Sequence, residues 1–183
     1  MNTGTLAAPV LVLDPSGEGA TRWEDCWPHR DDLPRRLPEM PVLGITAYDA
    51  GDEVPSRGWC FRRTPRPGQG RVTGRPTTGL LLVLISPRHS EGGQDLRDWA
   101  DFIHINHIAA AAVPGYLMIT PYENHGDGPR YLHFYEMDSE DPERTYQSMT
   151  PLVKQRLDDD EFTTWTRHPE LRIDYVSTYR LLP

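Results

Sequence analysis

The fold of this chain is decided by residues 99–136, which read WADFIHINHIAAAAVPGYLMITPYENHGDGPRYLHFYE. The first part of this stretch carries apolar side chains at helical spacing, and the Pro114-Gly115 pair ends the predicted helix. Two β-rich segments follow at residues 116–122 and 131–136, with a loop rich in Asn, Gly and Asp between them. The stretch therefore predicts a helix followed by two consecutive strands.

Elements on either side extend this order. The apolar run at residues 80–85 predicts a strand, residues 142–157 predict a helix, and a last strand follows near the C-terminus. The order β-α-β-β-α-β is that of a split βαβ unit, which builds one antiparallel sheet with helices on one face. The fold class is therefore α+β, and the other face of the sheet must be covered by something that shapes the pocket.

Composition and charge narrow the possible partners. The 183 residues fit one large domain or two small ones, and the formal net charge is −8, from 27 acidic and 19 basic residues. This balance argues against nucleic acid and anionic membrane surfaces as partners, because both attract basic faces. The sequence has no signal-peptide pattern and no apolar run near ~18 residues, and its two cysteines make no disulfide framework. We expect a cytoplasmic protein.

Two predicted strands end in a similar way. Residues 45–48 read Ile-Thr-Ala-Tyr and residues 119–122 read Ile-Thr-Pro-Tyr. One interpretation is an internal duplication, in which residues 1–76 form a degenerate ferredoxin-like half and residues 77–183 a complete ferredoxin-like domain. The other interpretation is chance recurrence on two β segments. In either case residues 62–76, rich in Arg, Gly and Pro, predict an extended loop.

The C-terminal part of the chain resembles a known superfamily. A helix with Trp99, His104 and His107 leads through Val-Pro-Gly into a strand, and PRYLHFYE at residues 129–136 marks the next one. These motifs are similar to those of the dimeric α+β-barrel superfamily, in particular the EthD-like proteins, with small polyketide cyclases and muconolactone isomerases as wider relatives. The resemblance covers residues 78–182. It implies two ferredoxin-like units whose sheets enclose a cavity, hence a homodimer unless the N-terminal half completes the barrel.

Strand alternation selects the first candidates for chemistry. Tyr131, His133 and Tyr135 share one face of their strand, and Leu132 and Phe134 share the other. Two purely apolar residues suit packing against helices, so we expect the Tyr-His-Tyr face to line the barrel cavity. His133 is the first candidate for proton transfer, because an imidazole is a usable base near neutral pH. The alternative is a histidine that only hydrogen-bonds a neighbouring tyrosine.

Other polar groups supplement this face. His104 and His107 lie three residues apart on the predicted helix, and one of them is expected at the cavity mouth. No third ligand stands at metal-site spacing, so we predict no metal. Glu123 could act as a base or orient a histidine, or could belong to an ordinary polar turn. We assign proton transfer to His133, His107, Tyr131 and Glu123, and substrate contact to His104, Tyr122, Tyr135, Tyr175, Tyr179 and Trp99.

The sequence and the resemblance together favour a cofactor-independent cyclase, isomerase or lyase. Such an enzyme holds a hydrophobic polyketide-like or aromatic small molecule in a reactive geometry and moves protons with His and Tyr side chains. Two alternatives remain open. One is a non-catalytic small-molecule binding or accessory protein on the same scaffold, and the other is a haem-binding or oxygen-using member of the superfamily.

Overall fold

Eight strands of the chain close into an antiparallel barrel in the order β4-β1-β3-β2-β9-β6-β8-β7, and β7 pairs back with β4. The computed structural model describes residues 6–33, 35–71 and 73–183. A two-residue strand, β5, pairs with the outer edge of β7. The strands are β1 (Val10–Asp14), β2 (Thr21–Asp25), β3 (Val42–Tyr48), β4 (Trp59–Arg63), β5 (Gln69–Gly70), β6 (Gly79–Pro87), β7 (Tyr116–Glu123), β8 (Tyr131–Met137) and β9 (Leu171–Leu181).

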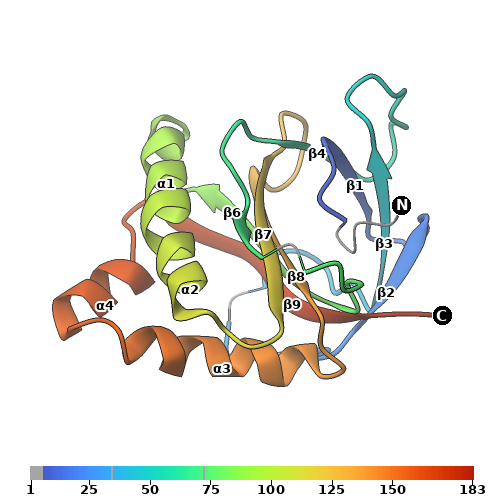
Figure 1. The fold of residues 1–183 in the computed structure, drawn as a ribbon. Helices are drawn as coiled ribbons and strands as arrows, with labels where there is room; N and C mark the ends of the chain where they lie inside the picture. The colour runs from blue at the N-terminus through green and yellow to red at the C-terminus, as the bar shows by residue number, and fades with distance from the viewer. Residues whose placement is uncertain (1–5, 34, 72) are drawn as a thin grey trace.

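The helices cover one side of strands β6 to β9, and strands β1 to β4 cover the other side (Figure 1). A continuous helical run connects β6 to β7, and α3 and α4 connect β8 to β9. The β-α-β-β-α-β order predicted for the C-terminal half is therefore confirmed. The helical segments are η1 (Ser90–Gly92), α1 (Gly93–Trp99), the π-helical turn η2 (Ala100–His104), α2 (Ile105–Ala111), α3 (Pro142–Lys154) and α4 (Asp159–Thr166).

Local sequence explains where these helices begin and end. Asp141 caps α3 by accepting a hydrogen bond from the backbone N–H of Arg144, and a proline occupies the first helical position. Asp158 and Glu161 form a capping box at the start of α4. Helix α2 ends at Ala111, and the capping residue Ala112 adopts a left-handed conformation with φ 50°.

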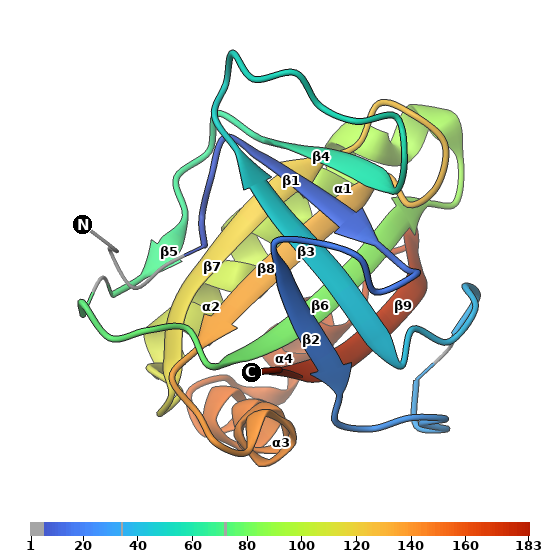
Figure 2. The same cartoon turned by 90° about the vertical axis from the view of Figure 1, so that its right-hand side faces the viewer.

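The two halves of the chain use the same strand permutation. Numbered within each half, β4-β1-β3-β2 and β9-β6-β8-β7 both read 4-1-3-2. The halves join through the pairs β2–β9 and β4–β7, so the barrel closes within one chain. Figure 2 shows β1, β2 and β3 crossing in front of the strands of the C-terminal half.

The N-terminal half differs from the sequence prediction in detail. Residues 45–48, predicted as the end of a strand, form the end of β3, but strand β2 was missed. Residues 29–33 (HRDDL) resemble residues 104–108 (HINHI) of the helical run before β7 in sequence, but they form no helix. The two Ile-Thr-x-Tyr segments lie on β3 and β7, which hold different places in the shared strand order.

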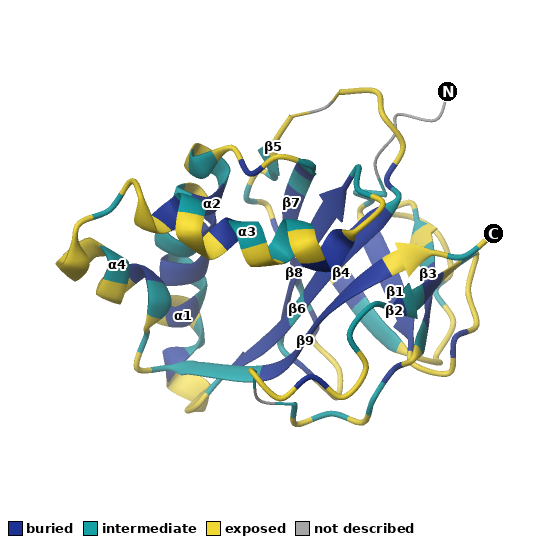
Figure 3. Ribbon diagram, turned by 90° about the horizontal axis from the view of Figure 1, so that it is seen from below, coloured by how far each residue is buried: buried dark blue, intermediate teal, exposed yellow. Residues whose placement is uncertain are grey.

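Two buried layers follow from this arrangement. The barrel core contains side chains from all eight barrel strands, whereas a second layer packs β6 to β9 against the helices. Strands β6, β8 and β9 are therefore buried on both faces along most of their length (Figure 3). The barrel core consists of Leu11, Leu13, Trp23, Met40, Leu43, Ile45, Phe61, Leu80, Leu82, Leu84, Tyr122, Leu132, Phe134, Tyr175 and Tyr179.

Candidate functional site

The predicted Tyr-His-Tyr face lies beneath the helices and not inside the barrel. Leu132 and Phe134 belong to the barrel core, whereas Tyr131 and Tyr135 pack in the layer between sheet and helices, and His133 shares their face of β8. The alternation was predicted correctly, but the side assigned to each set was wrong. The physical reason is that all seven residues of β8 are buried, so both faces need apolar partners.

In the barrel interior, three of the residues predicted to contact the substrate are buried core side chains. Tyr122, Tyr175 and Tyr179 are at most 1% exposed and belong to the barrel core. The Tyr122 hydroxyl donates to the backbone oxygen of Ala8 at 3.0 Å, and the Tyr179 hydroxyl donates to that of Met40 at 3.1 Å. Burial raises the pKa of Tyr122 to about 12, so its phenol is neutral. These hydrogen bonds give Tyr122 and Tyr179 a structural role in the barrel core.

Tyr175 lies in a polar cluster within this core. Its hydroxyl is 3.2 Å from that of Tyr179 and accepts a hydrogen bond from Arg35 at 3.3 Å. Arg35 also donates to Ser177, whose hydroxyl donates to Asp25 at 2.6 Å. The cluster supplies hydrogen-bond partners for the hydroxyls of Tyr175 and Ser177 and for the Asp25 carboxylate, and it ties the connection between β2 and β3 to β9.

A pocket of about 190 Å³ lies between the sheet and the helices. Its walls come from β6, β8, β9, α1, η2, α3, α4 and the connection between β2 and β3, and most of the lining side chains are apolar. We call it the helix–sheet pocket. Two histidines and two tyrosines line it, namely His104, His133, Tyr135 and Tyr146. Trp99 and Trp165 add two further aromatic rings. Four of the predicted residues therefore meet here: Trp99, His104, His133 and Tyr135.

His133 contacts a buried carboxylate at the wall of this pocket. Its Nε2 lies 3.4 Å from Oδ1 of Asp101, and each residue is 4% exposed. Arg66 donates to Oδ2 of Asp101 at 2.9 Å and also pairs with Asp98. Asp101 lies in the π-helical turn η2, a feature found often at functional sites. The arrangement is a histidine beside a carboxylate that an arginine holds in place.

His104 is held as a neutral imidazole. Its Nδ1 lies 2.9 Å from the backbone oxygen of Trp165, and because a carbonyl only accepts, Nδ1 carries the proton. The ring stacks on Trp165 at a centroid distance of 5.0 Å and an interplanar angle of 8°, and it lies 5.1 Å from the ring of Trp99. Burial lowers the pKa of His104 to about 4, against the opposing effect of the Trp165 hydrogen bond. Its Nε2 is therefore a hydrogen-bond acceptor at neutral pH.

The other predicted proton-transfer residues lie outside this pocket. His107 is half-buried one turn further along the helical run and does not line the pocket. The Tyr131 hydroxyl donates to the backbone oxygen of Gly93 at 2.9 Å. Glu123 forms ion pairs with Arg97 and Arg130, so its charge is already balanced. Tyr131 shares its face of β8 with His133, as predicted, but none of these three residues lines the pocket that contains His133.

The Asp101–Arg66 pair was not predicted from the sequence. Asp101 is an acidic residue on a mostly apolar helix, and Arg66 belongs to the loop 62–76, which was predicted only as an extended loop. The two residues are 35 positions apart. An acidic residue on a buried helix face was the one signal that could have suggested a partner across the layer.

Within the described ranges, no group of three or more His, Cys, Asp and Glu side chains could hold a metal ion. None of the described helices is long and apolar enough to cross a bilayer. The fold and the pocket define an α+β protein with a closed eight-stranded antiparallel barrel and an apolar, histidine-bearing pocket under its helices.

No protein-family model matches the chain, and no curated protein is significantly similar to it. A solved structure described as that of a major regulator of staphylococcal pathogenesis is similar in shape. The similarity covers 77% of this chain and 78% of that one, with 9% sequence identity and a TM-score of 0.46. At this level the similarity carries no argument about fold or function.

Proposed function

We propose that the protein is a cofactor-independent enzyme of the isomerase, cyclase or lyase type, which moves a proton on a small hydrophobic molecule in the helix–sheet pocket. The observation that carries this proposal is the buried contact between His133 and Asp101 at the pocket wall. A carboxylate beside an imidazole fixes the tautomer of the ring and stabilises the imidazolium that forms when the ring takes a proton.

The proposed roles follow from the positions of the groups. Nε2 of His133 lies 3.4 Å from Oδ1 of Asp101, an oxygen with no hydrogen-bond partner among the described residues. A proton on Nε2 would face this carboxylate and leave the Nδ1 lone pair to accept a proton from a carbon acid. Arg66 is a positioning residue, because it holds Asp101 and does not line the pocket. The hydroxyl of Tyr135 or Tyr146 donates a hydrogen bond to the enolate-like oxygen that develops as the proton leaves. Burial raises the pKa of both phenols, so each keeps its proton for donation.

The size of the pocket limits the substrate. A volume of about 190 Å³ is slightly larger than the ~150 Å³ of a dry protein cavity that binds benzene. It therefore suits a single-ring compound better than a folded polyketide. No arginine or lysine lines it among the described residues, which favours a neutral substrate.

We also propose that both halves derive from ferredoxin-like units of the dimeric α+β-barrel type, with an EthD-like C-terminal half. The shared 4-1-3-2 strand order supports this relationship. A barrel closed within one chain favours a monomer over the expected homodimer. Light scattering should then give 20.9 kDa, and a stable dimer at micromolar concentration would contradict this part of the proposal.

A proton-exchange assay tests the enzymatic proposal without knowledge of the product. Acetophenone is a single-ring ketone whose methyl protons exchange slowly in D₂O through an enolate. We expect the protein to accelerate this exchange, as followed by proton NMR. His133→Gln should lower the acceleration by about 100-fold or more, the usual effect of removing a general base. Asp101→Asn should lower it less, because the imidazole remains.

His107→Gln is the matched control, since His107 lies on the same helical run but outside the pocket. Its exchange rate should equal that of the wild type. Acetophenone that binds in saturation-transfer NMR without accelerated exchange would overturn the enzymatic proposal and favour the alternative of a small-molecule binding protein. Exchange that persists in His133→Gln would show that His133 is not the base.

A further inference from the structure

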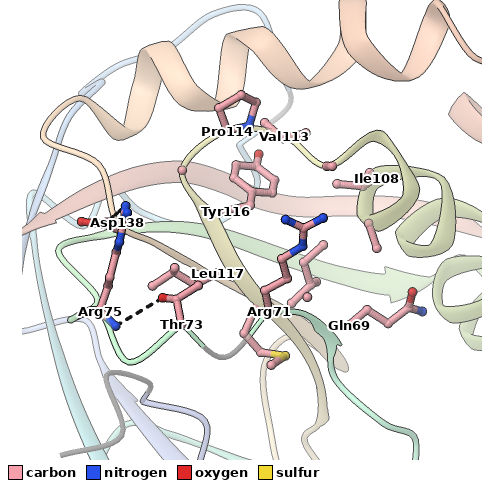
Figure 4. Close-up of a pocket in the computed structure, with 16 residues that line it drawn as sticks. Gln69, Arg71, Thr73, Arg75, Ile108, Val113, Pro114, Tyr116, Leu117 and Asp138 are labelled. Carbon is pink, nitrogen blue, oxygen red and sulfur yellow. Dashed lines mark hydrogen bonds and ion pairs between the residues drawn. The ribbon is translucent and has the colours of Figure 1, made fainter.

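A second and larger pocket lies at the edge of the sheet, away from the histidines. Its volume is about 430 Å³, and β5, β7 and the last turn of α2 surround it (Figure 4). We call it the edge pocket. This volume falls within the ~300–1,000 Å³ typical of small-molecule sites. None of the residues assigned to proton transfer lines it, so its chemistry is independent of the proposed reaction.

The charged side chains that line the edge pocket are two arginines and one aspartate. Arg75 forms an ion pair with Asp138 at 2.9 Å, so these two charges balance. Within the described ranges, the positively charged side chain of Arg71 has no hydrogen bond or ion pair. Figure 4 shows this side chain rising from the chain beyond β5 toward the space between Tyr116 and Ile108. The pocket thus carries a net positive charge in a protein whose formal net charge is −8.

The rest of the lining is apolar or neutral. Ile108, Val113 and Leu117 provide buried aliphatic surface. Tyr116 lines the same space, and burial raises the pKa of its phenol, which donates to Met149. The phenol therefore adds no negative charge.

The backbone fixes the position of Arg71. Its N–H donates to the backbone oxygen of Leu117 at 2.6 Å, and Gly70 pairs with Met118 in the short β5–β7 ladder. Gly70 has φ +146°, and a Cβ there would lie 2.1 Å from the oxygen of Leu117. Only a glycine lets the chain approach β7 this closely, so the rim that carries Arg71 is held against the pocket.

We propose that the edge pocket binds a small amphiphilic carboxylate. The acid group pairs with the Arg71 guanidinium, for which a carboxylate is a matching bidentate acceptor, and the apolar body lies along Leu117 and Ile108. This ligand differs from the neutral ring proposed for the helix–sheet pocket. The two sites can therefore be tested separately on the full chain.

Octanoate is a suitable probe, with 1-octanol as its neutral counterpart. In ¹H–¹⁵N correlation spectra, octanoate should shift the amides of Gly70, Gly115 and Leu117 in a saturable way. Arg71→Gln should weaken its binding at least tenfold, and 1-octanol should bind more weakly than octanoate and equally to both proteins. Arg57→Gln removes another exposed arginine, one paired with Glu18 away from the pocket, and should leave octanoate binding unchanged.

Three results would overturn the proposal. They are equal octanoate binding by Arg71→Gln and wild type, equal binding of octanoate and 1-octanol, and shifts confined to residues outside the edge pocket. Arg71 is exposed, so its substitution should leave the spectrum of the folded protein intact, and the same spectra verify this. His133→Gln should bind octanoate like the wild type, which separates this result from the fate of the proposed enzyme.

Discussion

His104 and Trp165 exchange two hydrogen bonds across the gap between η2 and α4. Nδ1 of His104 donates to the backbone oxygen of Trp165 at 2.9 Å, and Nε1 of Trp165 donates to the backbone oxygen of His104 at 3.0 Å. Their rings stack in nearly parallel planes. Because both residues line the helix–sheet pocket, this reciprocal pair fixes one wall of the candidate site. Protonation of His104 is therefore expected to change the free energy of unfolding.

The first prediction concerns pH. Burial lowers the pKa of His104 from 6.5 to about 4, so between these values the unfolded chain binds a proton that the folded chain does not. The free energy of unfolding should therefore fall as the pH drops from about 6.5 towards 4, by up to ~3 kcal/mol from this residue. Above about pH 6.5 both states are neutral, and His104 makes no pH-dependent contribution.

Urea unfolding at several pH values measures this effect. Carboxylates also titrate near the acid end of the range, so the useful quantity is the difference between the wild type and His104→Gln. The glutamine amide can still donate to Trp165 but cannot take up a proton in this range. We expect a shallower pH dependence in the variant. Parallel curves for the two proteins would contradict the low pKa.

The second prediction separates the two carboxylates that pair with Arg66. Asp101 is buried and contacts His133, whereas the side chain of Asp98 is 47% exposed. Asp101→Asn should destabilise the protein by about 1.5–3 kcal/mol, the usual range for a buried charge-assisted hydrogen bond. Asp98→Asn is the matched control and should cost less than about 1 kcal/mol. Equal losses of unfolding free energy for the two variants in urea denaturation would show that the burial of Asp101 does not strengthen its pairing with Arg66.

The third prediction concerns the N-terminal segment. The Tyr122 hydroxyl donates to the backbone oxygen of Ala8 and accepts from its N–H at 3.1 Å. Tyr122→Phe leaves both backbone groups without this partner and should cost about 1–3 kcal/mol. The amide of Ala8 should then exchange faster with deuterium. Tyr48→Phe is the control, because Tyr48 is half-buried and its hydroxyl has no hydrogen-bond partner among the described residues. The stability of this variant should differ from that of the wild type by less than about 0.5 kcal/mol.

Local patterns in the sequence predicted the C-terminal half well. The change of period in residues 99–136, with Pro114 and Gly115 at the boundary, depends only on neighbouring residues and gave the helix and the two strands. Strand β2 was missed because its sequence, TRWED, contains one strongly apolar residue, Trp23, which is also its one fully buried hydrophobic side chain. Alternation needs more than one such position to be visible.

The candidate site was harder to predict, because its key relationships join distant residues. Alternation on β8 correctly grouped His133 with Tyr135, but a strand buried on both faces does not reveal which set faces the barrel. The Asp101–Arg66 pair depends on how the loop after β4 folds back onto the helices. Both features are determined by tertiary packing, so one sequence without its contacts does not specify them.

The fourth prediction tests how the N-terminal half forms its part of the barrel. Asp14 at the end of β1 and Arg22 in β2 both lie opposite Gly44, on the two sides of β3. The connection at residues 15–20 must therefore cross β3, and a Cβ at Gly44 would lie 1.9 Å from the backbone oxygen of Glu18. Since this obstacle is backbone, a side-chain rotation cannot relieve it.

Gly44→Ala should consequently destabilise the protein by at least about 3 kcal/mol, because either the crossing or the β3 ladder must move. Gly51→Ala is the matched control, since a Cβ there meets nothing within 4 Å, and its stability should stay within about 0.5 kcal/mol of the wild type. Thermal and urea unfolding of both variants measure the difference. If Gly44→Ala were as stable as Gly51→Ala, the chain could not cross β3 at this glycine, and the strand order that the two halves share would lose its support in the N-terminal half.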